Sequence, residues 1–131
     1  MANEAVCIET PTKFVRRTIA AGAELPFGTI VKLSADPDTV AASAAADVFG
    51  GIVWTPSIST DTFTEITVAL DGTWDMKDAG AGITLGGIVS LNGANLIKQA
   101  VEAEMVTGAA FGKCLETAAA SEVVRTRVGE Y

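Results

Sequence analysis

Residues 20–33 read AAGAELPFGTIVKL, and residues 78–91 read DAGAGITLGGIVSL. At an offset of 58 positions the two stretches share seven identical residues: an Ala-Gly-Ala turn, a glycine, and the Ile-Val-x-Leu pattern of a strand. Glycine directly after an apolar residue, as in Phe27-Gly28 and Leu85-Gly86, permits a tight bend at the start of each strand. An ordered repeat of this kind indicates a duplicated supersecondary unit.

Two further blocks keep the same order in both copies. Phe49-Gly50 aligns with Phe111-Gly112 after a small insertion. The closing strands return to the first offset, with Ile66, Val68 and Leu70 matching Val124, Thr126 and Val128. One such unit is too small to bury its own apolar face, whereas two packed units can share a core. We therefore predict an all-β fold, a small barrel-like body of two internal β repeats with a pseudo-twofold relation. The repeats are expected at about 18–74 and 75–131, after an extended N-terminal arm at 1–17.

The expected strands are short runs rich in Val, Ile and Thr that lie between glycine-containing turns. They span residues 14–19, 29–33, 51–54, 64–70, 87–91, 95–100, 113–116 and 123–128. Asn92-Gly93 suits a tight hairpin, because both central positions of that turn need positive φ. Thr39–Val48 and Val101–Met105 contain good helix formers, and we expect at most a short helix of one or two turns in each.

Composition and charge exclude several classes of function. The chain has 131 residues, of which 49% are hydrophobic, so an ordered core is expected. With 9 basic and 16 acidic residues and a net charge of −7, it is a poor partner for a phosphate backbone, and we expect no nucleic-acid binding. Histidine is absent, which excludes His-based catalysis and ligation. Since no apolar run approaches the ~20 residues that span a bilayer, no membrane partner is expected.

The sequence offers no convincing cofactor or metal site. Cys7 and Cys114 match no metal-ligand spacing, and we interpret them as buried thiols in preference to a disulfide. Aspartates in Asp36-Pro37-Asp38 and at Asp71, Asp75 and Asp78 match no Ca²⁺ loop and are expected to shape turns. We therefore predict neither a bound metal nor a cofactor.

Two groups of residues are candidates for contacts with a partner. Lys13, Arg16 and Arg17 supply three of the nine basic residues within five positions, and Phe14 lies among them. This arm is either a partly ordered tail or a partner-binding segment that adds a strand to a neighbour. Trp54 and Trp74 lie at expected strand ends, where they serve either as core lids or as interface anchors.

The tandem units resemble the small capsid decoration, or cement, proteins of tailed bacteriophages. The elements that carry the resemblance are Arg16–Ala23, Gly28–Val31, Phe49–Val53 and Val68–Gly72, with a second copy at Ala79–Ala81, Gly86–Val89 and Phe111-Gly112. The resemblance covers about residues 14–129. It implies a non-enzymatic structural virion protein on the outer surface of the capsid. Such a protein binds the major capsid protein, clamps neighbouring capsomers and forms a homo-oligomer, usually a trimer.

The basic cluster is compatible with that role, because Lys13, Arg16 and Arg17 could pair with acidic patches on a capsid. An alternative is a small β-barrel module that binds carbohydrates or receptors through Trp54, Trp74 and the loops 57–62 and 92–95. A third, weaker hypothesis is an enzyme acting through paired carboxylates, at Glu65 and Asp71 or at Glu102 and Glu104. Small β domains carry such pairs far more often on solvated faces.

Overall fold

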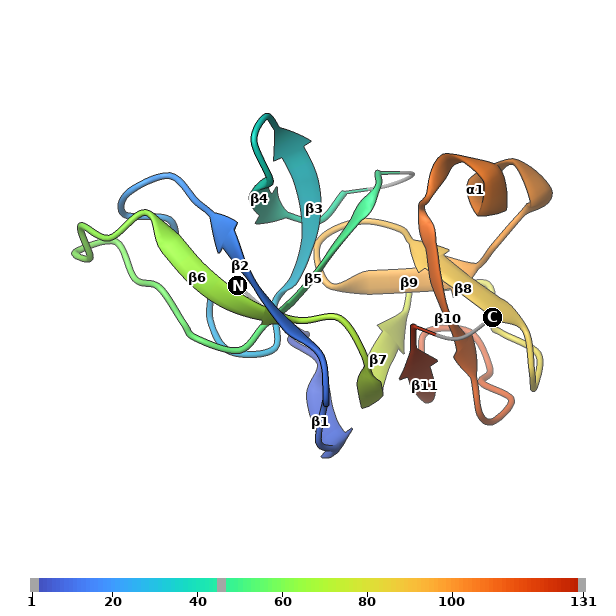
Figure 1. Ribbon diagram of the computed structural model, residues 1–131. Helices are drawn as coiled ribbons and strands as arrows, with labels where there is room; N and C mark the ends of the chain where they lie inside the picture. Colours follow the sequence, from blue (N-terminus) through green and yellow to red (C-terminus); the bar gives the residue numbers. More distant parts are fainter. Residues whose placement is uncertain (1–2, 45–46, 130–131) are drawn as a thin grey trace.

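Both repeats fold into closed, five-stranded barrels that lie side by side in the computed structural model (Figure 1). The structure describes residues 3–44 and 47–129. The first barrel contains β2 (Phe14–Thr18), β3 (Ile30–Ala35), β4 (Thr39–Ala42), β5 (Phe49–Val53) and β6 (Glu65–Ala69). The second contains β7 (Gly72–Asp78), β8 (Ile88–Leu91), β9 (Leu96–Gln99), β10 (Ala110–Cys114) and β11 (Val123–Val128). The prediction of an all-β body built from two repeats is confirmed.

The two barrels have the same topology. The strand order is β2-β4-β3-β5-β6 in the first and β7-β9-β8-β10-β11 in the second. In each, the first strand pairs in parallel with the third and antiparallel with the last, which closes the barrel. Only Leu70 and Asp71 separate the barrels, so each unit begins a few residues before the Ala-Gly-Ala block. The first strands, FVRRT and GTWDM, have no identical residue at equivalent positions, so the repeat is recognisable in the sequence only from the later blocks.

Strand register corrects the alignment of Phe49 with Phe111. Gly51 pairs with Val31 in the first barrel, and Gly112 pairs with the equivalent Val89 in the second. Gly51 and Gly112 are therefore the equivalent residues, and Phe111 occupies the position of Gly50, at a β-bulge in each barrel. The phenylalanines were aligned because each precedes a glycine, but three inserted residues, not four, separate the two copies here.

Alternation along the strands divides the apolar residues between two clusters. The interior of the first barrel contains Ile19, Leu25, Val31, Val40, Val53, Ile66 and Val68. Their strand neighbours Ile30, Ile52 and Ala69 point the opposite way and pack with Trp74, Val89 and other residues of the second barrel. Because side chains alternate across a strand, these strands bury one face inside the first barrel and the opposite face against the second barrel. The two barrels consequently share one core.

The helix expected within Thr39–Val48 is wrong, although residues 45–46 lie outside the described part of the chain. Residues 39–42 form β4, which lies between β2 and β3 and buries Val40 in the barrel. Alanine favours helix by only tenths of a kcal/mol per residue, and the strand pairing needed to close the barrel outweighs that preference. The second expected helix is confirmed as α1 (Glu102–Thr107), which ends at Gly108 with φ of 89°.

The N-terminal arm is built into the fold. Its strand β1 (Val6–Glu9) pairs antiparallel with β7, at the edge of the second barrel's sheet. The Ala5 N–H donates to the Gly28 carbonyl at 2.8 Å, and Ala5 is buried. The chain then crosses to the first barrel, where residues 14–17 of the expected arm belong to β2. The arm thus adds a strand within its own chain and joins the two barrels.

The hairpin at Asn92-Gly93 forms, but its turn is wider than expected. It connects β8 to β9, and positive φ falls on Gly93 and Asn95 instead of on two adjacent positions. Both cysteines are free thiols, as predicted; Cys114 is buried, whereas Cys7 is only partly covered. Among the described residues, no helix has the length and apolar character to cross a membrane.

Candidate functional site

The strand β2 divides the predicted basic cluster between its two faces. Val15 points into the first barrel, so Lys13 and Arg17, two residues away on either side, share its face. Phe14 and Arg16 lie on the opposite face. The cations that are adjacent in the sequence therefore do not form one patch, and they belong to two different surfaces of the molecule.

Arg16 already has an acidic partner. Its Nε lies 3.3 Å from Glu65 Oε2 on the neighbouring strand β6. The two side chains are 67% and 57% exposed, so the pair is solvated and contributes at most about 1 kcal/mol to stability. Glu65, considered above for catalysis, is thus paired with Arg16 on an open surface.

Four aromatic residues form a connected group, here called the aromatic cluster: Phe14, Phe27, Trp54 and Trp74. The ring of Trp54 lies 5.1 Å from those of Phe14 and Phe27 and 6.3 Å from Trp74, centroid to centroid. Trp74 is fully buried, and its Nε1 donates to the Asp71 carbonyl at 3.0 Å. Trp74 is therefore the buried base of the cluster.

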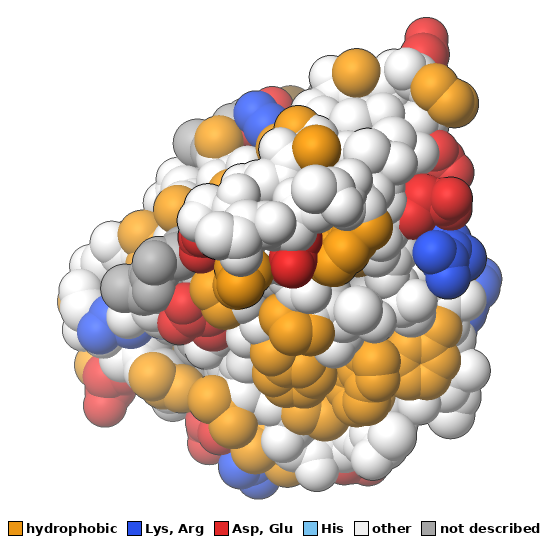
Figure 2. All heavy atoms as spheres, turned by 90° about the vertical axis from the view of Figure 1, so that its left-hand side faces the viewer, with side chains coloured by type: hydrophobic (Ala, Val, Ile, Leu, Met, Phe, Trp, Pro, Cys, Tyr) orange, Lys and Arg blue, Asp and Glu red, His pale blue; other side chains and the backbone are white. Residues whose placement is uncertain are grey.

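The outer members of the aromatic cluster face solvent. Phe14 is 40% exposed, Phe27 is 41% exposed, and Trp54 is partly covered between them. Figure 2 shows the molecule from the side of the first barrel, where hydrophobic side chains gather into a patch on the lower part of the face. Rigid, partly exposed aromatic rings on a packed base are typical of residues that anchor a protein interface.

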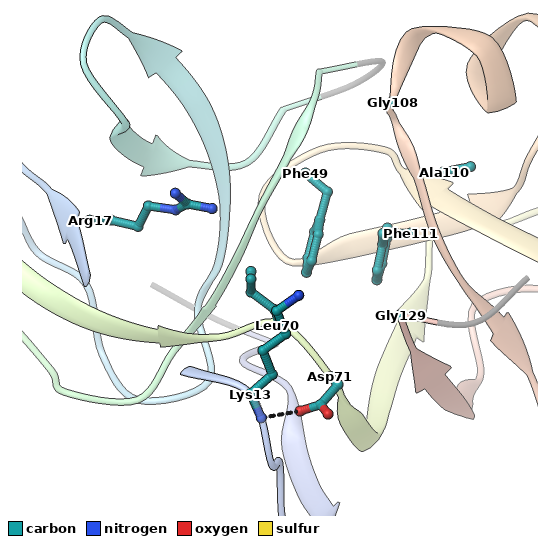
Figure 3. A pocket seen from close by; sticks show the side chains of 9 residues that line it. All are labelled: Lys13, Arg17, Phe49, Leu70, Asp71, Gly108, Ala110, Phe111 and Gly129. Atoms are coloured by element: carbon teal, nitrogen blue, oxygen red, sulfur yellow. Dashed lines mark hydrogen bonds between the residues drawn. The ribbon is translucent and has the colours of Figure 1, made fainter. Parts of the chain in front are cut away.

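A cleft of about 540 Å³ lies between the two barrels on another surface (Figure 3). Its lining comes from both barrels and from the end of the arm: Lys13, Arg17, Phe49, Leu70, Asp71, Gly108, Ala110, Phe111 and Gly129. Sequence reasoning missed this cleft, because its residues are brought together only when the barrels pack.

Phe49 and Phe111 form one wall of the cleft. Their rings stack with centroids 4.5 Å apart and planes inclined by 9°. Phe111 is buried and Phe49 is partly covered. The two residues were aligned as equivalent positions of the repeats, and that alignment does not indicate that their side chains contact each other across the seam. The stack gives the cleft a flat, apolar side that belongs to both barrels.

Lys13 and Arg17 bring positive charge to the same cleft. Both side chains extend from β2 and its preceding residue toward the stacked rings (Figure 3). Arg17 Nε donates to the Gly50 carbonyl at 3.3 Å, which fixes the guanidinium near the β5 bulge. No carboxylate within residues 3–44 and 47–129 forms an ion pair with either cation.

Asp71 is the acidic residue of the lining. Its carboxylate accepts hydrogen bonds from the N–H of Thr12 at 2.9 Å, the hydroxyl of Thr12 at 2.6 Å and the N–H of Lys13 at 3.0 Å. Desolvation acts to raise the pKa of Asp71, but these hydrogen bonds, together with the charge of Arg127, outweigh it and lower the pKa. Asp71 therefore stays ionised and holds the arm against the second barrel.

Two further carboxylates, one considered for catalysis and one for a metal site, have structural contacts. Glu104 is the buried residue of α1, and its carboxylate accepts from the Val101 N–H at 2.8 Å and forms an ion pair with Lys98 at 2.9 Å. Asp78 is buried at the end of β7, and its Oδ2 accepts from the N–H groups of Gly80, Gly82 and Ser121. The interpretation of Asp78 as a residue that shapes turns is confirmed.

In the part of the chain that the structure describes, no three carboxylates or thiols are grouped so as to hold a metal ion. Comparison of the sequence with protein-family models and with curated proteins gave no match. The functional interpretation therefore depends on the two surfaces described above, the aromatic cluster and the cleft between the barrels.

Proposed function

We propose that this protein is a non-enzymatic structural component of a bacteriophage virion that binds the outer surface of the capsid and clamps neighbouring capsomers. The observation that carries the proposal is the duplicated barrel body, two closed barrels of identical strand order, as expected from the resemblance to tandem-repeat decoration proteins. On this proposal the partner is the major capsid protein, and the protein acts as a homo-oligomer, with a trimer as the expected state.

The aromatic cluster supports a role in adhesion. Phe14 and Phe27 expose about two-fifths of their surface and rest on Trp54, which in turn contacts the buried Trp74. Docking would bury apolar surface on rings that are already held in place, so little side-chain entropy is lost on binding. A capsid offers many equivalent sites, and simultaneous contacts with several subunits would raise the avidity beyond that of one contact.

The body also suits a clamp. The two barrels share one core, and β1 together with Ala5 ties the arm to both of them. A two-lobed body with one shared core resists bending and rotation between the subunits it contacts, whereas a flexible tether resists only their separation. The net charge of −7 would in addition reduce nonspecific association with nucleic acid.

The test is binding to purified, expanded capsids of the corresponding phage. We expect the protein to cosediment with capsids and to raise their melting temperature. Phe14→Ala and Phe27→Ala should each weaken binding by roughly tenfold or more, as for anchor residues at interfaces. Phe63→Ala is the matched control, because Phe63 is also 41% exposed but contacts none of the rings of the aromatic cluster.

Absence of cosedimentation with wild-type protein would contradict the proposal. Equal binding by Phe14→Ala, Phe27→Ala and wild-type protein would leave the capsid role in place but remove the aromatic cluster from the interface. The melting temperature of each free variant must be measured alongside, because both rings also contact Trp54.

The partly exposed face of Trp54 also favours a second candidate, a carbohydrate-binding module. Aromatic rings stack on sugar faces, and Trp54 lies between two exposed phenylalanines. Of the residues first considered for this function, Trp74, Asn95 and Ser57 are fully buried, so Trp54 and the exposed parts of the loops 57–62 and 92–95 would have to supply the contacts. A glycan-array signal that Trp54→Ala abolishes, together with no binding to capsids, would favour this function.

A further inference from the structure

Two cations that line the cleft between the barrels form no ion pair with the described residues. Lys13 and Arg17 approach from one side, and neither forms an ion pair with any described carboxylate. By contrast Arg16, Lys32, Lys98 and Arg125 all have acidic partners within 3.3 Å. In a chain with 16 acidic residues, a pair of cations without such partners in a recess is suited to an anion from another molecule.

We propose that this cleft binds an aspartate or glutamate side chain presented by an extended acidic segment of a partner protein. The guanidinium of Arg17 has N–H donors in one plane, and the ammonium of Lys13 is a single charge at the end of a flexible chain. Together the two groups can bind a carboxylate from adjacent directions. That the partner segment belongs to the capsid rests on the proposed function; the binding of the carboxylate does not.

The remaining lining fits a side chain attached to a polypeptide. The stacked rings of Phe49 and Phe111 provide an apolar wall for the methylene groups of the bound residue. Gly108 and Gly129 also line the cleft, so their backbone amides lie close to any bound segment. A volume of about 540 Å³ exceeds that of a carboxylate alone and accommodates a side chain with its flanking backbone.

Asp71 does not cancel the positive charge of the cleft. Both of its carboxylate oxygens accept hydrogen bonds from Thr12 or Lys13, which direct its charge toward the arm. The lining residues still carry two positive charges against one negative charge. A long phosphate backbone is a poorer occupant than a short acidic peptide, because repulsion by the rest of this acidic protein grows with the number of negative charges that the ligand carries.

The test uses the full chain labelled with ¹⁵N and a capped tetrapeptide of glutamate as the probe. We expect saturable chemical-shift changes at the amides of Gly108, Ala110 and Gly129, and weaker binding as salt is added. A capped tetrapeptide of glutamine should produce no such changes. Equal responses to the two peptides, or to inorganic phosphate at the same concentration, would overturn the proposal.

Two double variants with the same change in net charge distinguish binding in the cleft from a general electrostatic effect. Lys13→Gln combined with Arg17→Gln should weaken binding of the glutamate peptide by roughly tenfold or more, as expected for the loss of charge-assisted hydrogen bonds. Arg16→Gln combined with Lys77→Gln removes the same charge outside the cleft and should leave binding unchanged. Since Arg17 also bonds to the Gly50 carbonyl, Lys13→Gln alone serves as a second variant that retains this contact.

Peptide binding to the cleft and cosedimentation with capsids test the two proposals independently. Peptide binding at the cleft without cosedimentation with capsids would support the carboxylate site and contradict the proposed function. Cosedimentation that persists in the Lys13→Gln, Arg17→Gln double variant, with no binding of the glutamate peptide to wild-type protein, would overturn the carboxylate site and leave the proposed function standing.

Discussion

The side chain of Asn95, in the turn between β8 and β9, accepts a hydrogen bond from the backbone N–H of Ile30 in β3, with Oδ1 and N 2.8 Å apart. Both residues are fully buried, and they belong to different barrels. Ser43 extends the contact, because its hydroxyl donates to the Gly93 carbonyl and accepts from the Asn95 N–H. Polar contacts thus bridge the apolar seam between the repeats and fix how they pack.

Asn95→Ala should destabilise the protein by about 2–3 kcal/mol. The substitution leaves the buried N–H of Ile30 without its acceptor and places alanine at a φ of 57°, which asparagine tolerates better. Chemical denaturation measures the loss. Asn92→Ala in the same turn is the control and should cost under about 1 kcal/mol, since Asn92 has ordinary φ. Equal losses for the two variants would show that Asn95 does not join the barrels.

Gly28→Ala should release the arm, whereas Gly86→Ala should not. The two glycines are equivalent in the repeats and have φ of 87° and 78°, so each substitution costs about 1 kcal/mol of backbone strain. A Cβ at Gly28 would also overlap the carbonyl oxygen of Ala5, while one at Gly86 would meet open space. Hydrogen exchange should therefore accelerate at the Ala5 amide in Gly28→Ala only. Unchanged protection of Ala5 would contradict the described docking of the arm.

Glu104 should make stability depend on pH in the acid range. Desolvation acts to raise its pKa, but hydrogen bonds from Val101 and Lys98 and the charge of Lys98 outweigh it, so the pKa is lowered. A lowered folded-state pKa means that the stabilisation is present above the unfolded-state pKa, about 4.3, and is lost as the pH falls through the folded-state value. Wild-type protein should be more stable than Glu104→Gln at pH 7, with a difference that shrinks below about pH 4.

The control for this pH dependence is Glu102→Gln, because Glu102 is an exposed residue of the same helix. Its unfolding free energy should stay within about 0.5 kcal/mol of wild type at pH 7. A difference between wild type and Glu104→Gln that stays constant from pH 7 to pH 3 would show that ionisation of Glu104 is not responsible.

Asp78→Ala should be among the most destabilising substitutions outside the apolar core, at about 3 kcal/mol. It removes the acceptor for three backbone N–H groups, of Gly80, Gly82 and Ser121, and so loosens two loops at once. Asp61 provides a comparison, since its carboxylate accepts from one N–H, that of Ile58. Asp61→Ala should cost about 1 kcal/mol by thermal denaturation. A similar cost for both would mean that the additional bonds to Asp78 contribute nothing.

The repeat and the strands with plain alternation could be predicted from the sequence. The identical glycines predict the bends, and the Ile-Val-x-Leu pattern predicts which face of each strand is buried. A barrel forms when the first and last strands of such a unit pair. β7 was missed, because Asp75, Lys77 and Asp78 obscure the alternation of Trp74 and Met76. β4 was missed because alanine carries little information about strand pairing, which depends on neighbours distant in sequence.

The candidate site was only partly predictable. Lys13, Phe14, Arg16 and Arg17 were selected as one cluster, yet a strand places adjacent residues on opposite faces. The partners that define each surface, Trp54 with Phe27 on one and Phe49 with Phe111 on the other, come from remote segments. The stacking of Phe49 on Phe111 depends on a bulge and on the packing of the barrels, which no local pattern encodes.

The pairing of β1 with β7 imposes an order on folding during translation. During translation the first barrel can close once β6 has left the ribosome, but Val6–Glu9 have no partner until β7 emerges. Until then the backbone N–H and C=O groups of this segment lack their strand partner and can pair with extended segments of other nascent chains. Slow synthesis through residues 72–78 would prolong that exposure, so the yield of soluble protein should respond to codon choice in this stretch.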